Sequence, residues 1–153
     1  MQQVTLDEIE AAAASIIYAE MQATPQYFWP LLCERLGIEV WVKHENYTPN
    51  SAFKIRRGLV YFAHLTNSSA IPKGVVCATR GNHGQSEGFA ARRYGIPATI
   101  VVPHANGVEK NAAMRALGVK LLEHGDDFST ARAFAKKMAG EQSLQIMDLL
   151  IGC

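Results

Sequence analysis

The second half of the sequence alternates between short apolar segments and longer segments of helical periodicity, and this alternation restricts the fold more than any other feature. Four apolar segments predict strands, at Gly74–Ala78, Ala98–Val102, Val119–Glu123 and Ser143–Met147. The segments between them predict helices, at Gly84–Tyr94, Val108–Leu117 and Phe128–Met138, the last with Asp126 or Asp127 as N-cap and Gly140 just beyond it. Such strand–helix–strand units form parallel sheets. We therefore predict an α/β fold, with an open, mostly parallel sheet and helices on both faces.

The first half of the sequence predicts further helices and one more strand. Helices are expected over residues 7–21, over Leu31–Leu36 with Gly37 as its end, and over Phe53–Leu65, and a strand of period two over Ile38–Lys43. Ligands of open parallel sheets bind outside the carboxyl ends of the strands. The loops after Ala78, Val102 and Glu123 are therefore where functional residues are expected.

Composition excludes several classes of function. The 153 residues carry a net charge of +1, which gives no electrostatic reason to bind nucleic acid or an anionic membrane. No apolar stretch approaches the ~20 residues of a membrane span, and the first residues do not resemble a signal peptide. The three cysteines form no CxxC pair, so neither a metal site nor a disulfide framework is expected, and Cys77 is expected in the core. These features predict a cytoplasmic protein.

The first candidate for chemistry is Lys54, which lies between Phe53 and Ile55 at an expected helix start. Desolvation and the positive end of the helix dipole both disfavour an ammonium group there, and a neutral amine is what Schiff-base chemistry requires. The alternative is a lysine whose apolar stem is covered while its charged end reaches solvent.

The second candidate is the segment Thr79–Gln85, which follows an expected strand and opens a helix. Gly81 and Gly84 permit close backbone approach, and the helix start offers N–H groups to a carboxylate or phosphate. The alternative is a tight strand-to-helix turn without a ligand. Neither His44 nor His83 has a carboxylate next to it in sequence other than Glu45, so acid–base chemistry at either histidine is not favoured.

Together the two segments resemble the fold-type-II pyridoxal-phosphate (PLP) enzymes, and within them the threonine/serine dehydratases. The residues that carry the resemblance are Val42–Asn46 with Ala52–Arg56, the asparagine loop Gly81–Gln85, and Pro103–Lys110 with the Leu117–Gly118 turn. Asn82 follows Lys54 by 28 residues. The pair of motifs at this spacing is more specific than either alone.

The resemblance implies a tryptophan-synthase-β-like fold of which this chain matches the N-terminal half. It implies an N-terminal piece of the larger PLP domain over residues 1–48, a small α/β domain over residues 49–147, and a divergent, truncated tail over residues 148–153. It further implies a homo-oligomer for the full-length parent. The glycine-rich loop with which the family binds the PLP phosphate has no counterpart after Gly140.

The resemblance also implies the roles of individual residues. Lys54 would bind PLP as a Schiff base and serve as catalytic base, with Phe53 packed near the cofactor ring and Asn82 hydrogen-bonded to the ring hydroxyl. The loop Thr79, Arg80, Gly81, Asn82 and His83 would bind the carboxylate of a small amino-acid substrate. The reaction would be β-elimination of water and ammonia from a 3-hydroxy amino acid, giving a 2-oxo acid.

Arg80 departs from the family pattern, because a small residue is common at this position in dehydratases and racemases. An arginine does not act as a base in proteins, so racemisation is disfavoured, and a bidentate contact to the substrate is expected instead. The alternative to an active enzyme is a truncated remnant that folds or binds ligands without chemistry.

Overall fold

A computed structural model describes residues 4–147 of the chain, which divides into two compact units, with the boundary in the sequence between Phe53 and Lys54. Each unit is described by itself. The tail expected over residues 148–153 lies outside the described residues. Within the described range, no helix combines the length and the apolar character needed to cross a membrane.

The second unit is built on a four-stranded sheet in the order β5-β4-β3-β6. All three neighbouring pairs are parallel, which confirms the sheet expected from the sequence. The strands are β3 (Val75–Ala78), β4 (Ala98–Val102), β5 (Lys120–Glu123) and β6 (Gln145–Ile146).

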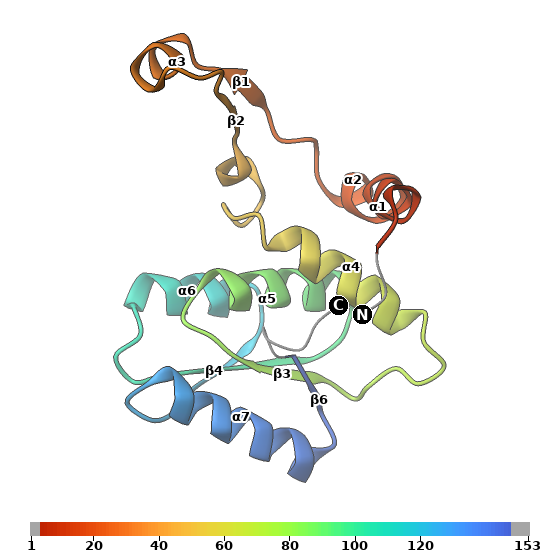
Figure 1. Cartoon of the computed structure of the whole chain (residues 1–153). Helices are drawn as coiled ribbons and strands as arrows, with labels where there is room; N and C mark the ends of the chain where they lie inside the picture. Colours follow the sequence, from red (N-terminus) through yellow and green to blue (C-terminus); the bar gives the residue numbers. More distant parts are fainter. Residues whose placement is uncertain (1–3, 148–153) are drawn as a thin grey trace. The chain divides into compact units, whose positions relative to one another are not determined.

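Helices cover both faces of this sheet, as expected (Figure 1). Three lie on one face, α4 (Ile55–Thr66), α5 (Asn82–Tyr94) and α6 (Val108–Ala116), and α7 (Phe128–Gln142) lies on the other. The alternation of side chains along β3 divides the core accordingly. Cys77 packs with Phe62 and Met114, whereas Val76 packs with Ala131 on the α7 side. The expectation that Cys77 is a core residue is confirmed.

Several helix boundaries differ from those expected by one or more residues, and those of α5 and α7 have a clear physical reason. Helix α5 begins at Asn82 rather than Gly84. The asparagine loop therefore forms the N-cap and the first turn of this helix. The seventh helix runs through Gly140 to Gln142, and Ser143 with a φ of 53° ends it. An exposed glycine is tolerated inside a helix at a cost of about 1 kcal/mol, so the expected stop at Gly140 was wrong.

The first unit starts with an N-terminal helix that is confirmed but not uniform. It consists of α1 (Leu6–Ala12), a π-helical turn η1 (Ala13–Ile17) and α2 (Tyr18–Glu20). Thr5 and Glu8 form a capping box at its start. Inside the π-helical turn, the Ser15 hydroxyl donates to the carbonyl of Ala11 at 2.6 Å. Such competition for a backbone carbonyl disturbs regular α-helix.

A two-stranded antiparallel sheet follows in the first unit. It pairs β1 (Gln26–Phe28) with β2 (Trp41–Lys43), and α3 (Pro30–Leu36) connects them, ending at Gly37 in the left-handed conformation. A 3₁₀ turn η2 (Glu45–Tyr47) comes next. The sequence did not predict β1, because Pro25 and Pro30 flank it and pairing with β2 rather than local preference forms it.

Candidate functional site

The loop after β3 lies at the carboxyl edge of the parallel sheet, where the sequence places functional residues. The buried Thr79 accepts a hydrogen bond through Oγ1 from the Gly81 N–H at 3.1 Å, which fixes the turn into α5. Gly81 is the N-cap and has no capping side chain. The first-turn N–H groups of a helix lack intrahelical acceptors, so this start is suited to an anion.

Gly84 holds this first turn close to the sheet and to α6. A Cβ at this position would lie 2.5 Å from Met114 Sδ and 2.5 Å from Thr79 Cγ2. Any larger residue would therefore push α5 away from both neighbours. The sequence suggested that Gly84 permits close approach to the backbone. In the structure this glycine permits α5 to pack closely against its neighbours.

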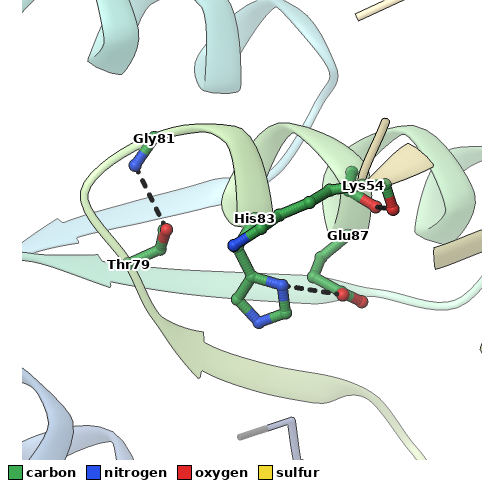
Figure 2. Close-up of polar contacts among 6 residues, drawn as sticks. Lys54, Thr79, Gly81, His83 and Glu87 are labelled. Atoms are coloured by element: carbon green, nitrogen blue, oxygen red, sulfur yellow. Dashed lines mark hydrogen bonds and ion pairs between the residues drawn. The ribbon is translucent and has the colours of Figure 1, made fainter. Parts of the chain in front are cut away.

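Lys54 is the N-cap residue of α4, and its side chain is half-buried. The Ser86 hydroxyl on α5 donates to the Lys54 carbonyl at 2.6 Å, and the Gly58 N–H donates to the same carbonyl at 3.2 Å. A Cβ at Gly58 would collide with the Ser86 side chain. A partly buried hydrogen bond thus joins Lys54 to the residue that directly follows the asparagine loop. Figure 2 shows the Lys54 side chain pointing toward the start of α5, where His83 lies.

The segment before Lys54 belongs to the first unit and is ordered by Thr48. Its buried hydroxyl donates to the Ala52 carbonyl and accepts from the Ala52 N–H, both at 2.9 Å. Between them Ser51 adopts the left-handed conformation, with a φ of 54°. Phe53, expected beside the cofactor ring, is 61 % exposed.

Two polar residues of the segment Thr79–His83 are exposed to solvent. Asn82 and Arg80 are both exposed. The pKa of Asp127, the confirmed N-cap of α7, is lowered mainly by the N–H of Thr130 at 2.8 Å and, to a smaller extent, by the charge of Arg80. The guanidinium group of Arg80 therefore acts electrostatically on the start of α7 as well as lying in the candidate loop.

His83 has a carboxylate partner that the sequence analysis missed. Its Nδ1 lies 3.2 Å from Oε1 of Glu87, one helical turn further along α5, and both side chains are almost fully buried (Figure 2). The spacing of four residues on a helix was the available signal. Burial raises the pKa of Glu87 to about 8, and the charge of Arg57 opposes this rise. Burial, followed by the charge of Glu87, raises the pKa of the Cys77 thiol.

Lys110 on α6 is a second residue that sequence reasoning missed. Its position resembled a solvated helix face, yet a Cβ at Gly81 would lie 3.3 Å from Lys110 Cδ and 3.8 Å from Nζ. The lysine side chain therefore crosses over the glycine of the loop. The contact joins the loop after β3 to the first turn of α6, and it depends on the order of the strands in the sheet. A local sequence pattern therefore does not predict it.

Comparison with known proteins identifies the family. Residues 17–147 match the model of the family described as "Pyridoxal-phosphate dependent enzyme". The chain belongs to this PLP-dependent enzyme family. It is 37 % identical over 126 residues to the chloroplastic biosynthetic threonine dehydratase 1 of Solanum lycopersicum, a match that covers 82 % of this chain and 21 % of that protein. It is 34 % identical over 128 residues to the L-threonine ammonia-lyase of Thermotoga maritima, covering 84 % of this chain and 31 % of the relative.

A solved structure of the family agrees with the fold. The processed form of threonine deaminase isoform 2 from Solanum lycopersicum superposes with a TM-score of 0.80 at 28 % identity. The superposition covers 95 % of this chain and 43 % of that one. The chain thus spans less than half the length of the relatives it matches, and the fold-type-II fold expected from its motifs is confirmed.

The residues present fit part of the cofactor of this family. PLP requires a primary amine and a hydrogen-bonding partner for its ring hydroxyl, and the half-buried Lys54 and the exposed Asn82 are of the right chemical types. For the phosphate group, the described residues that follow Gly140 contain no glycine at all.

Proposed function

We propose that this chain carries the lysine-bearing part of a PLP-dependent enzyme that eliminates water from a small 3-hydroxy amino acid. Hydrolysis of the released enamine takes up one water and frees ammonia, so the net loss from the substrate is ammonia. The product would be a 2-oxo acid. When bound, PLP supplies an electron sink for the carbanion at the substrate Cα. The threonine dehydratases among the relatives support this reaction class.

The proposal assigns a role to each of the candidate site residues. Lys54 binds the cofactor covalently through Nζ and, as a free amine, takes the Cα proton as general base. Asn82 hydrogen-bonds the ring hydroxyl, and Phe53 packs near the ring. The backbone of the loop Thr79–His83 binds the substrate carboxylate at the start of α5. Arg80 adds a charged contact to the substrate.

The observation that carries the proposal is the hydrogen bond from Ser86 Oγ to the Lys54 carbonyl. It holds the backbone of Lys54, at the start of α4, against the second turn of α5. The half-buried Lys54 side chain also points toward the start of α5, where His83 lies (Figure 2).

The experiment is covalent trapping of PLP with borohydride, followed by peptide mass spectrometry and the visible spectrum of the mixture. We expect the adduct on Lys54 in the wild type, its loss in Lys54→Ala, and its retention in Lys73→Ala, which removes an exposed lysine before β3. Equal labelling of the wild type and Lys54→Ala would contradict the proposal.

A second candidate function is that of a remnant which folds and binds ligands without turnover. The chain covers 21–43 % of the three relatives compared above, so cofactor binding and turnover by this chain are tested separately. Incubation with PLP and L-threonine distinguishes the two candidates. Release of 2-oxobutanoate and ammonia supports the enzyme, whereas a Lys54 adduct without product supports the remnant.

A further inference from the structure

The carboxyl group of Glu87 is buried in the second turn of α5, one helical turn after His83 of the candidate loop. Only 1 % of the residue is exposed. Among the described residues neither of its carboxyl oxygens has an aligned hydrogen-bond donor. A carboxylate buried in this way is costly, whereas a protonated carboxyl can donate its own O–H. The acceptor within reach is His83 Nδ1, 3.2 Å from Oε1.

The charged groups around Glu87 come from three directions. Arg57 on α4 and the thiol of Cys77 on β3 interact electrostatically with its carboxyl group. From α6, Lys110 approaches the start of α5 at Gly81, and β4 contributes no titratable side chain. Lys54 points toward the same end of the helix (Figure 2). Arg57 favours ionisation of Glu87, but burial outweighs it.

We propose that Glu87 is a positioning residue that sets the tautomer and orientation of the His83 imidazole, and with them the backbone of the loop Gly81–His83. A protonated Glu87 donates to Nδ1, which leaves the imidazole proton on Nε2. Loss of one proton from the pair moves the imidazole proton to Nδ1, where it is donated to the carboxylate. His83 Nε2 thereby changes from donor to acceptor.

The consequence for the loop follows from the position of His83. It is the second residue of α5, so its backbone belongs to the turn that offers N–H groups to an anion. The side chain is confined by burial, and Gly84 leaves no free space beside Met114 and Thr79. A change at the ring is therefore transmitted to the backbone. That this backbone binds a substrate carboxylate rests on the proposed function.

The test is the ¹⁵N spectrum of the histidine side chains in the full chain between pH 6 and 9.5, without PLP. His83 is assigned by the signals lost in His83→Asn. We expect its signals to change from the Nε2–H to the Nδ1–H pattern with a midpoint at about pH 8, the pKa of Glu87. The amide signals of Gly81 and Asn82 should shift with the same midpoint.

Glu87→Gln should abolish the transition, because the amide does not titrate. Glu109→Gln, which removes an exposed carboxylate in the first turn of α6, should leave it unchanged. An imidazolium pattern for His83 at pH 7, or the same curve in the wild type and Glu87→Gln, would overturn the inference. If Glu87→Gln does not fold, the absence of any transition in the wild type between pH 7 and 9 is decisive against it. Failure of PLP trapping at Lys54 would instead count against the proposed function alone.

Discussion

The buried carboxyl group of Glu87 should make the stability of the second unit depend on pH in a direction opposite to that of most carboxylates. Its pKa rises from 4.5 to about 8 on folding. Between these values the folded state holds one proton more than the unfolded state, so the free energy of unfolding falls as the pH rises through this window. One pKa unit corresponds to about 1.4 kcal/mol, so the full loss is about 5 kcal/mol.

Glu87→Gln should remove this dependence, because the amide has nearly the same size and does not titrate. The assay is urea unfolding at pH 5, 6, 7, 8 and 9, followed by far-UV circular dichroism, to which the longer helices of the second unit contribute most. Tryptophan fluorescence serves as an internal control, since both tryptophans, Trp29 and Trp41, lie in the first unit. Glu109→Gln is the matched exposed control.

The quantity that decides is the difference between the unfolding free energies of Glu87→Gln and the wild type. We expect it to shift in favour of the variant by several kcal/mol from pH 5 to pH 8 and then to become constant. A difference that is the same at every pH would refute the reasoning, because it would mean that Glu87 ionises alike in the folded and unfolded chain.

Two further predictions concern the junction of α4 and α5 and the packing of α5. Ser86→Ala removes one of the two donors to the Lys54 carbonyl, which keeps the Gly58 N–H, and should lower the free energy of unfolding by about 0.5–1.5 kcal/mol; a value near zero in urea unfolding would exclude that bond as a structural link. Gly84→Ala should lower it by about 1–3 kcal/mol, because the added methyl would overlap Met114. Gly140→Ala is the control in an open helical position and should raise stability by about 0.5–1 kcal/mol. Equal effects of the two alanine substitutions, measured by circular dichroism, would contradict the packing argument.

Much of the second unit could be predicted because its signals are local. The apolar strands and the amphipathic helices each occupy one continuous segment, and their alternation determines a parallel sheet. The strand β1 lacked such a signal, since three residues between Pro25 and Pro30 form a strand only through pairing with β2. The π-helical turn at Ala13–Ile17 likewise interrupts a segment whose composition favours an ordinary helix.

The candidate site was predictable in its motifs but not in the contacts between them. Lys54 and the loop at Gly81 could be found from the residues themselves, because each has an unusual local pattern. The hydrogen bond from Ser86 to Lys54 joins residues 32 positions apart, and burial of Glu87 depends on helices that approach it from elsewhere in the chain. Such contacts follow from tertiary packing, which periodicity does not specify.

The order of the strands has a consequence for the chain while it is being synthesised. The strand β3 is buried along its whole length and is paired on one side by β4 and on the other by β6. Its partners on the β6 side, Gln145 and Ile146, are made about 70 residues later than Val75 and Val76. Until then an apolar strand presents unpaired backbone groups along one edge, which is the kind of surface that leads nascent chains to associate. Pairing of β3 with β6 covers this edge, and it thereby removes a surface on which nascent chains could associate.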